Sequence, residues 1–271
     1  MSVPFLIEPG ELPAALAAGA LLLDARPRAH FLRGHIPGAL PYSTYDVFVQ
    51  DTTLDGMKAF AADMAMHYGL TGGSLDKPVV VYDDDTGMRA ARELWILEYI
   101  GHPQARMLHG GYRQWLAAGG KPAMDDARTT RPKRLQPTVA SGTFASADEL
   151  ARRAGSETLF ILDVRDDLEW AGTDNTACCA LRGHIPKALH LEWTSFLEGG
   201  RFKPKEAILE LLAQRGIDPN GDIVPYCHRG ARSASAYYAL RLAGCSGARN
   251  FIGSWHEWSA RGFPVEAGAA P

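Results

Sequence analysis

The chain has 271 residues, which is enough for one large domain or for two of ordinary size. Hydrophobic residues make up 46% and charged residues 22%, a balance typical of a globular protein and not of a disordered one. The formal net charge of -3 argues against a general nucleic-acid binder, and no apolar run approaches the roughly 18 residues of a membrane-spanning helix. Because the first residues lack the basic region of a secretory signal, we expect a cytoplasmic protein without nucleic-acid or membrane partners.

Short aliphatic runs alternate with helical patterns along the chain. This alternation is typical of an α/β fold in which a mainly parallel central sheet is flanked by helices. Two of the strand-to-helix connections are short loops, DDTGMR in the first half and CHRGAR in the second. In chain order, the expected elements are a strand at 77–83, a helix at 90–101, strands at 158–163 and 222–226 separated by a helix at 205–216, and a helix at 233–243.

The chain contains an internal repeat. The segment RGHIPGAL at 33–40 returns as RGHIPKAL at 182–189, and LLLDAR ending at Arg26 returns as FILDVR ending at Arg165. The second copy also carries an insertion, GTDNTACCAL, at 172–181. These matches predict two copies of one domain-sized unit of about 120–130 residues, and therefore two tandem α/β domains.

The polar stretch that begins at Asp125 predicts the boundary between the two copies. It contains Pro132 and Pro137 and has no apolar periodicity, which is typical of a solvated linker. We therefore expect an N-terminal domain at 1–124, a linker at 125–141 and a C-terminal domain at 142–271.

The loop CHRGAR carries the candidate chemistry. Cys227 stands at the predicted strand end, and Gly230 permits a tight backbone path before the helix. The unpaired N–H groups and positive dipole end of that helix favour a thiolate, and His228, Arg229 and Arg232 are expected to add positive charge. Because the thiolate is the nucleophilic form of cysteine, the loop predicts nucleophilic chemistry and stabilisation of a persulfide anion.

Three motifs, DVR with GHIPKA, the loop C-x-x-G-x-R, and GSWHEW with GFPVE, together resemble the rhodanese superfamily. The duplicated arrangement resembles the two-domain thiosulfate and 3-mercaptopyruvate sulfurtransferases. The resemblance implies a double displacement without cofactor or metal, in which a donor passes sulfur to Cys227 and an acceptor such as cyanide or a thiol removes it. A reduced thiol carrier is a further candidate acceptor. The resemblance makes Cys227 the catalytic residue and assigns substrate binding to His228, Arg229, Gly230, Ala231, Arg232 and Ser233.

The resemblance also implies an inactive first domain. When Gly87 is aligned with Gly230, Asp84 stands opposite Cys227, and a carboxylate cannot hold a transferable sulfur. We therefore expect the N-terminal domain to be a scaffold or a wall of the pocket.

The basic pair His228–Arg229 favours thiosulfate over 3-mercaptopyruvate as the donor, because a guanidinium forms paired hydrogen bonds with oxyanions. Arg232 has two interpretations, contact with the donor or anchoring of the loop through backbone carbonyls. Glu169 stands where well-known two-domain members carry a donor-binding arginine. It would either repel a dianionic donor or be exposed and never meet it.

The other cysteines leave alternatives open. Cys178 and Cys179 are either simple loop thiols or a pair that resolves the persulfide as a disulfide, and Cys245 is expected to be structural. An adjacent pair without further ligands nearby in sequence is a poor metal site.

Two other functions compete with sulfur transfer. A Cys-x5-Arg phosphatase does not fit, because Arg232 gives the shorter Cys-x4-Arg spacing. A non-catalytic binding module would suit the first copy alone.

Overall fold

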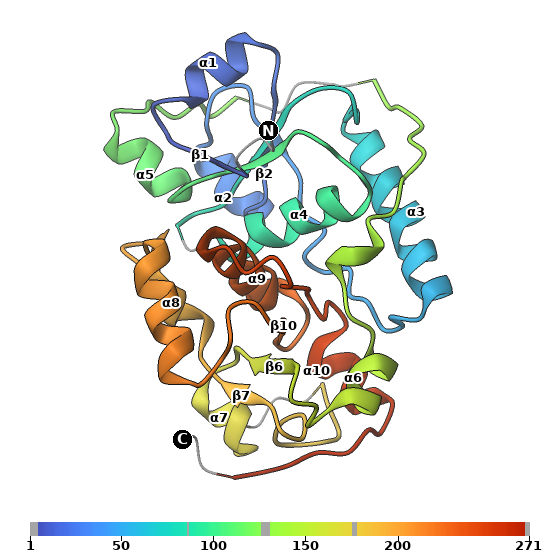
Figure 1. The fold of residues 1–271 in the computed structure, drawn as a ribbon. Coiled ribbons are helices and arrows are strands. Elements are labelled where there is room, and N and C mark those ends of the chain that lie inside the picture. The colour runs from blue at the N-terminus through green and yellow to red at the C-terminus, as the bar shows by residue number, and fades with distance from the viewer. Residues whose placement is uncertain (1–4, 86, 126–130, 175–177, 269–271) are drawn as a thin grey trace. The chain divides into compact units, whose positions relative to one another are not determined.

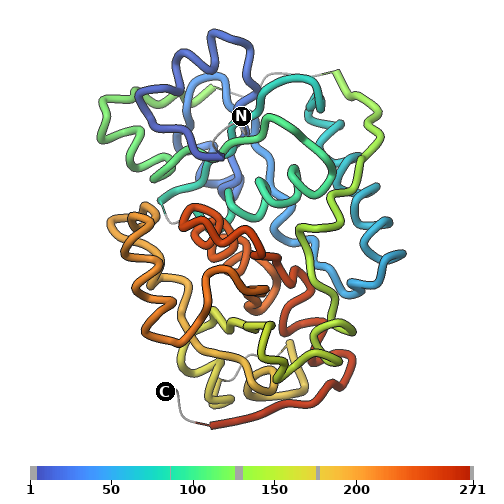
Figure 2. The backbone as a smooth tube through the Cα atoms, in the orientation of Figure 1, coloured from blue at the N-terminus to red at the C-terminus, as the bar shows by residue number. Residues whose placement is uncertain are grey.

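The computed structural model describes residues 5–85, 87–125, 131–174 and 178–268 (Figures 1 and 2). Residues 126–130 of the predicted linker lie outside this part, as do Thr86 in the first loop and 175–177 in the insertion. The chain divides into two compact units. The first comprises 1–47, 58–140 and 199–201, and the second comprises 48–57, 141–198 and 202–271. The domain limits of 1–124 and 142–271 stay a prediction.

The first unit is built on a five-stranded sheet with the order β1-β5-β4-β2-β3, in which every pairing is parallel. Alternate strand side chains pack against α1 and α2 on one face, and α4 packs on β4 and β5 (Figure 1). The elements are β1 (Leu6–Ile7), α1 (Leu12–Ala17), β2 (Leu21–Asp24), α2 (Arg28–Arg33), β3 (Leu40–Pro41), α3 (Leu54–Leu70), β4 (Val79–Tyr82), α4 (Met88–Tyr99), β5 (Ala105–Leu108) and α5 (Gly111–Ala117).

The second unit has a parallel sheet with the order β10-β6-β7, and a separate pair, β8 and β9. Helices α6 and α10 share a hydrophobic core with one face of the sheet, while α9 packs on β10 and α8 on α9 (Figure 1). The elements are η1 (Ser141–Thr143), α6 (Ala147–Arg153), β6 (Leu159–Asp163), α7 (Asp167–Ala171), β7 (Leu189–His190), η2 (Trp193–Phe196), β8 (Leu197–Glu198), β9 (Arg201–Phe202), α8 (Lys205–Gln214), β10 (Asp222–Tyr226), α9 (Ala231–Ala243) and α10 (Ser254–Ala260).

These parallel sheets with flanking helices confirm the predicted α/β fold of two similar domains. Helix α9 begins two residues earlier than expected, at Ala231, and α8 ends at Gln214, two residues before Gly216. Along the described residues, no helix combines the length and the apolar character that crossing a membrane requires.

A buried network fixes the ends of β6 and β10. The side chain of Arg165 forms paired hydrogen bonds with the carboxylate of Asp163, and the hydroxyl of Tyr226 donates to the same carboxylate. Burying these charges is tolerated because each is paired and hydrogen-bonded. The network therefore anchors the strand end from which the loop CHRGAR departs.

The histidines of the two GHIP segments stack on aromatic rings inside the fold. The ring of His35 stacks on Phe31 at 3.8 Å between centroids, and the ring of His184 stacks on Trp170 at 3.5 Å. Nδ1 of His184 also lies 3.0 Å from the carbonyl oxygen of Trp170. These contacts give both residues a structural role.

Candidate active site

The loop from Cys227 to Gly230 joins β10 directly to α9 in the second unit. Gly230 adopts a left-handed conformation with φ of 87°. A Cβ at this position would lie 2.6 Å from the carbonyl oxygen of Ile252, so both the backbone angle and the space require glycine. The tight path predicted from the sequence is therefore present, and it places Cys227 beside the start of the helix.

The sulfur of Cys227 is buried, with 1% of the residue exposed, and is surrounded by donors. The amide of Gly230 donates to Sγ at 3.1 Å, and the hydroxyl of Ser254 lies 3.8 Å from it. The same hydroxyl accepts the amide of Cys227 at 3.1 Å and donates to the carbonyl of Phe251 at 2.8 Å. Ser254 thus couples the catalytic loop to the start of α10.

The pKa of Cys227 is lowered although the residue is buried. Burial alone raises the pKa of a thiol, because it penalises the charged form. Here the charge of Arg232, the amide and hydroxyl of Ser233 and the amide of Arg229 outweigh burial. The start of α9, with Ala231 buried and Ser233 fully buried, therefore forms a cradle that favours the thiolate.

Arg232 forms a bidentate ion pair with Glu169, with distances of 2.5 and 2.8 Å between nitrogens and carboxylate oxygens. Glu169 is 8% exposed and belongs to a capping box with Asp166 at the start of α7. The interpretation of Glu169 as an exposed residue is wrong, because its side chain is buried, whereas repulsion of a donor stays a prediction. Among the described residues, Arg232 anchors the loop to the carboxylate of Glu169 rather than to backbone carbonyls.

His228 does not supply the positive charge that the sequence suggested. Burial, together with the charges of Arg229 and Arg232, lowers the pKa of His228 to about 4. The imidazole is therefore neutral at neutral pH. Its Nε2 lies 2.7 Å from the sulfur of Cys178 and 3.6 Å from that of Cys179.

Arg229 packs over an aromatic ring that the sequence analysis did not identify. Its guanidinium carbon lies 4.2 Å from the ring centroid of Phe48, and its Nε is buried with no hydrogen-bond partner among the residues that the structure describes. The ring of His256 lies 5.5 Å from that of Phe48, and burial and Arg229 lower the pKa of His256. With Arg232 paired and His228 neutral, Arg229 supplies most of the positive charge that the loop can offer an anion.

The loop of the first unit contains a carboxylate in the place of the sulfur, but it belongs to Asp83 and not to Asp84. Tyr82 pairs with Asp24 in the sheet as Tyr226 pairs with Asp163, so the residue after Tyr82 corresponds to Cys227. The alignment that placed Asp84 opposite Cys227 was wrong, because the first loop is one residue longer before its glycine.

The Asp83 carboxylate accepts the amides of Gly87, Arg89 and Ala90 at 2.9–3.1 Å, as the sulfur of Cys227 accepts the amide of Gly230. Asp84 instead pairs with Arg26 and His30 at 3.4 and 3.0 Å. A carboxylate thus fills the helix-start cradle of the first unit.

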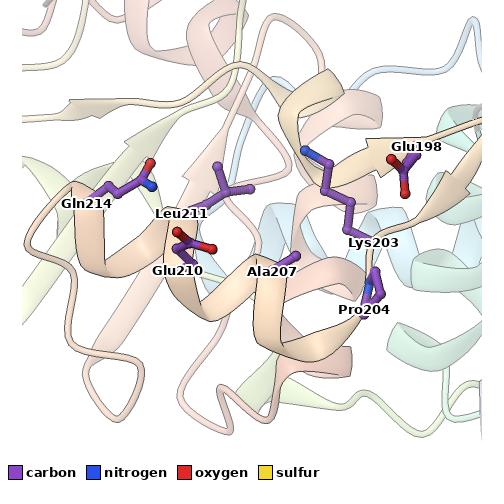
Figure 3. A pocket seen from close by; sticks show the side chains of 7 residues that line it. All are labelled: Glu198, Lys203, Pro204, Ala207, Glu210, Leu211 and Gln214. Carbon is purple, nitrogen blue, oxygen red and sulfur yellow. The ribbon is translucent and has the colours of Figure 1, made fainter.

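A surface hollow lies along α8 and the preceding strands (Figure 3). No residue from 227 to 233 lines it, so the candidate chemistry does not take place there. The residues that line it are Glu198, Lys203, Pro204, Ala207, Glu210, Leu211 and Gln214.

Removal of the Arg232 charge should raise the pKa of Cys227. In the double variant Arg232→Met/Glu169→Gln, which leaves no unpaired buried charge, we expect the pKa of Cys227 to rise, because Arg232 contributes most to lowering it. The pH dependence of alkylation at Cys227, followed by mass spectrometry of its peptide, measures the shift. Arg152→Met, which removes an exposed charge from α6, is the control. An unchanged profile in the double variant would contradict the account.

Asp83 should make the stability of the protein depend on pH. Burial raises its pKa from 3.8 to about 6, more than its backbone hydrogen bonds lower it. The folded state therefore holds the proton more tightly, and stability falls as the pH rises from about 4 to about 6. We expect Asp83→Asn to gain stability over the wild type by up to about 2–3 kcal/mol across this range. Denaturant titrations measure the difference, with Asp63→Asn on α3 as the control; a constant difference would refute the prediction.

Comparison with known proteins agrees with this geometry. The model of the rhodanese-like domain matches residues 8–118 and again 146–261. A thiosulfate sulfurtransferase of Pseudomonas aeruginosa is 32% identical over 261 residues, 94% of each chain, and one of Azotobacter vinelandii is 31% identical over 259 residues, 95% of this chain and 94% of its own. SseA from Escherichia coli, a 3-mercaptopyruvate sulfotransferase, is 21% identical and shares the fold, with a TM-score of 0.78 over 93% of this chain and 99% of its own. The chain belongs to the rhodanese family and is a sulfurtransferase built from two rhodanese-like domains.

Proposed function

We propose that the protein transfers a sulfane sulfur from an anionic donor to a thiophilic acceptor through a persulfide on Cys227. The observation that carries the proposal is the buried sulfur of Cys227, whose pKa is lowered by the charge of Arg232 and by the amides and hydroxyl at the start of α9. A buried thiol with no such cradle would remain protonated and inert. The named thiosulfate sulfurtransferases that resemble this chain over most of its length support the same chemistry.

In the first step, the Cys227 thiolate attacks the outer sulfur of thiosulfate. The sulfur–sulfur bond of the donor breaks, and sulfite leaves with the bonding electron pair, so that the enzyme retains Cys–S–S⁻. The amides that face the thiolate would stabilise the charge on this persulfide with little rearrangement. In the second step, cyanide or a thiolate attacks the outer sulfur and the Cys227 thiolate is released.

We favour thiosulfate over 3-mercaptopyruvate because of the charge beside the loop. The Arg229 guanidinium has a buried Nε without a partner and can pair with an oxyanion. Glu169 does not repel the donor strongly, since Arg232 neutralises it. The six positions His228, Arg229, Gly230, Ala231, Arg232 and Ser233 are proposed to surround the bound donor.

We propose that only the second domain is catalytic. In the first, the carboxylate of Asp83 occupies the cradle and cannot accept a transferable sulfur. We also propose a cytoplasmic location, where a nucleophilic thiol stays reduced and a reduced thiol carrier can serve as acceptor. Membrane and nucleic-acid partners form no part of this proposal.

Incubation with thiosulfate should add one sulfur atom, about 32 Da by intact mass, to the wild-type chain, because the cradle stabilises the persulfide anion. Cys245→Ser, which removes a buried thiol elsewhere in the second unit, should take up the same mass. Cys227→Ser should take up none. The proposal would be refuted if the wild type formed no adduct with thiosulfate or another sulfane donor. It would also be refuted if Cys227→Ser formed an equal adduct.

Arg229→Ala should reduce kcat/KM for thiosulfate by about tenfold to a hundredfold, the loss expected for one charged hydrogen-bonding partner. Stability should fall by a smaller factor, about 0.5–1 kcal/mol, because the variant loses the contact with Phe48. Steady-state kinetics measure the effect, and Arg152→Met is again the control. Unchanged thiosulfate turnover would show that Arg229 is not the anion-binding group.

A further inference from the structure

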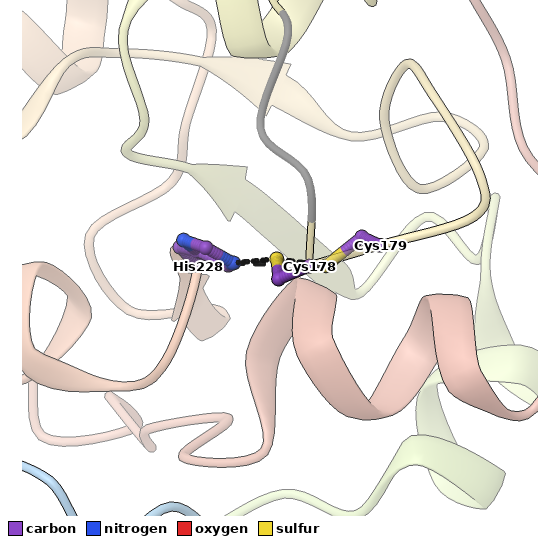
Figure 4. Close-up of side chains that lie close together, drawn as sticks. All are labelled: Cys178, Cys179 and His228. Atoms are coloured by element: carbon purple, nitrogen blue, oxygen red, sulfur yellow. Dashed lines mark hydrogen bonds between the residues drawn. The ribbon is translucent and has the colours of Figure 1, made fainter.

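The insertion of the second domain brings two thiols against the imidazole of His228 (Figure 4). The sulfurs of Cys178 and Cys179 lie 2.7 Å apart, and the three donor atoms all lie within 4.8 Å of one another. The sequence alone offered the adjacent cysteines no third ligand. The fold supplies one, 49 residues further along the chain from Cys179.

The insertion is held in a position that presents both thiols. A Cβ on Gly172 would lie 2.7 Å from the amide nitrogen of Gly183, so the first residue of the insertion lies against the chain just after its last residue. The amide of Leu181 donates to the hydroxyl of Ser259 on α10 at 3.0 Å. Cys179 is 8% exposed and belongs to the hydrophobic core of the second unit, while Cys178 is exposed. One thiol is thus fixed and the other is accessible from solvent.

We propose that Cys178, Cys179 and His228 form a binding site for one thiophilic metal ion, of which Zn²⁺ is the representative. Two cysteine sulfurs and one imidazole nitrogen are ligands that zinc prefers, and three protein ligands leave one coordination position open. Binding releases the two thiol protons to solvent and oxidises nothing. The imidazole loses no net proton, because it is already neutral and its single proton can reside on Nδ1 when Nε2 binds the ion.

Local charge is compatible with such an ion. Burial, together with the neighbouring Cys178, raises the pKa of Cys179 to about 12. The charges of Arg229 and Arg182 act in the opposite direction and lower it. Two thiolates neutralise a divalent ion, so the complex carries no net charge for these guanidiniums to repel. The same positive surroundings would oppose a divalent ion held by neutral ligands.

Metal binding at this site is a property separate from the proposed sulfur transfer, and it would also affect that transfer. Because His228 follows Cys227 directly, an ion on its Nε2 would tie the insertion to the catalytic loop. His228 is also one of the residues proposed to surround the bound donor, so an ion on its Nε2 would take that nitrogen away from the donor. Metal binding at this site therefore inhibits sulfur transfer reversibly, and chelation restores it.

Equilibrium loading with Zn²⁺ tests the site. Reduced protein is loaded without oxygen and desalted, and zinc is counted by elemental mass spectrometry. The wild type and Cys245→Ser should each retain about one ion per chain, and Cys178→Ser/Cys179→Ser close to none. Cys178→Ala changes only the exposed thiol, so we expect the variant to keep its fold. Competition with a chromophoric chelator should show that its affinity for zinc is at least about tenfold lower than that of the wild type.

Cys227→Ser separates the site from the catalytic proposal. We expect this variant to retain about one zinc ion, because its cluster is intact. Loss of zinc from Cys227→Ser, or full retention by Cys178→Ser/Cys179→Ser, would overturn the site. Zinc should also slow the wild type but not the double cysteine variant, each compared with its own metal-free rate. Failure of the wild type to take up sulfur would refute the proposed function and leave the zinc count unaffected.

Discussion

The chemistry proposed for this protein depends on the balance between burial and charge at one sulfur atom. Burial of Cys227 favours the neutral thiol, whereas Arg232 and the amides at the start of α9 favour the thiolate. Much of the surrounding structure maintains this balance. Gly230 permits the turn that aims its own amide at the sulfur, and Ser254 fixes the backbone of the loop from the side of α10.

Glu169 limits the positive charge beside that sulfur. Its bidentate pair with Arg232 holds the guanidinium in place, and a capping box holds Glu169 on α7. Because Glu169 engages both terminal nitrogens of Arg232, an incoming anion meets chiefly Arg229. The two units also share one feature: backbone amides at the start of a helix donate hydrogen bonds to an anionic group. In the second unit the group is the sulfur of Cys227, and in the first it is the carboxylate of Asp83.

The repeated motifs and alternating strands predicted the duplicated α/β fold correctly, since both depend on local sequence patterns. The corresponding residue in the first loop was misplaced by one position. Gly87 and Gly230 align in sequence, but the pairing of Tyr82 with Asp24 sets the true register. Sequence alone could not pair Arg232 with Glu169, which lies 63 residues away, or show that burial makes His228 neutral. The contact between the insertion and His228 depends on tertiary structure in the same way.

At Cys227 the charge of Arg232 and the donors at the start of α9 outweigh burial, and a titration of the thiolate measures this balance. The ultraviolet absorbance of the thiolate is followed against pH in the wild type and in Cys227→Ser, and the difference gives the pKa of this one residue. We expect the midpoint of this titration to lie below 9.0, the ordinary pKa of a cysteine thiol. A midpoint above 9.0 would show that burial prevails, and would contradict the account.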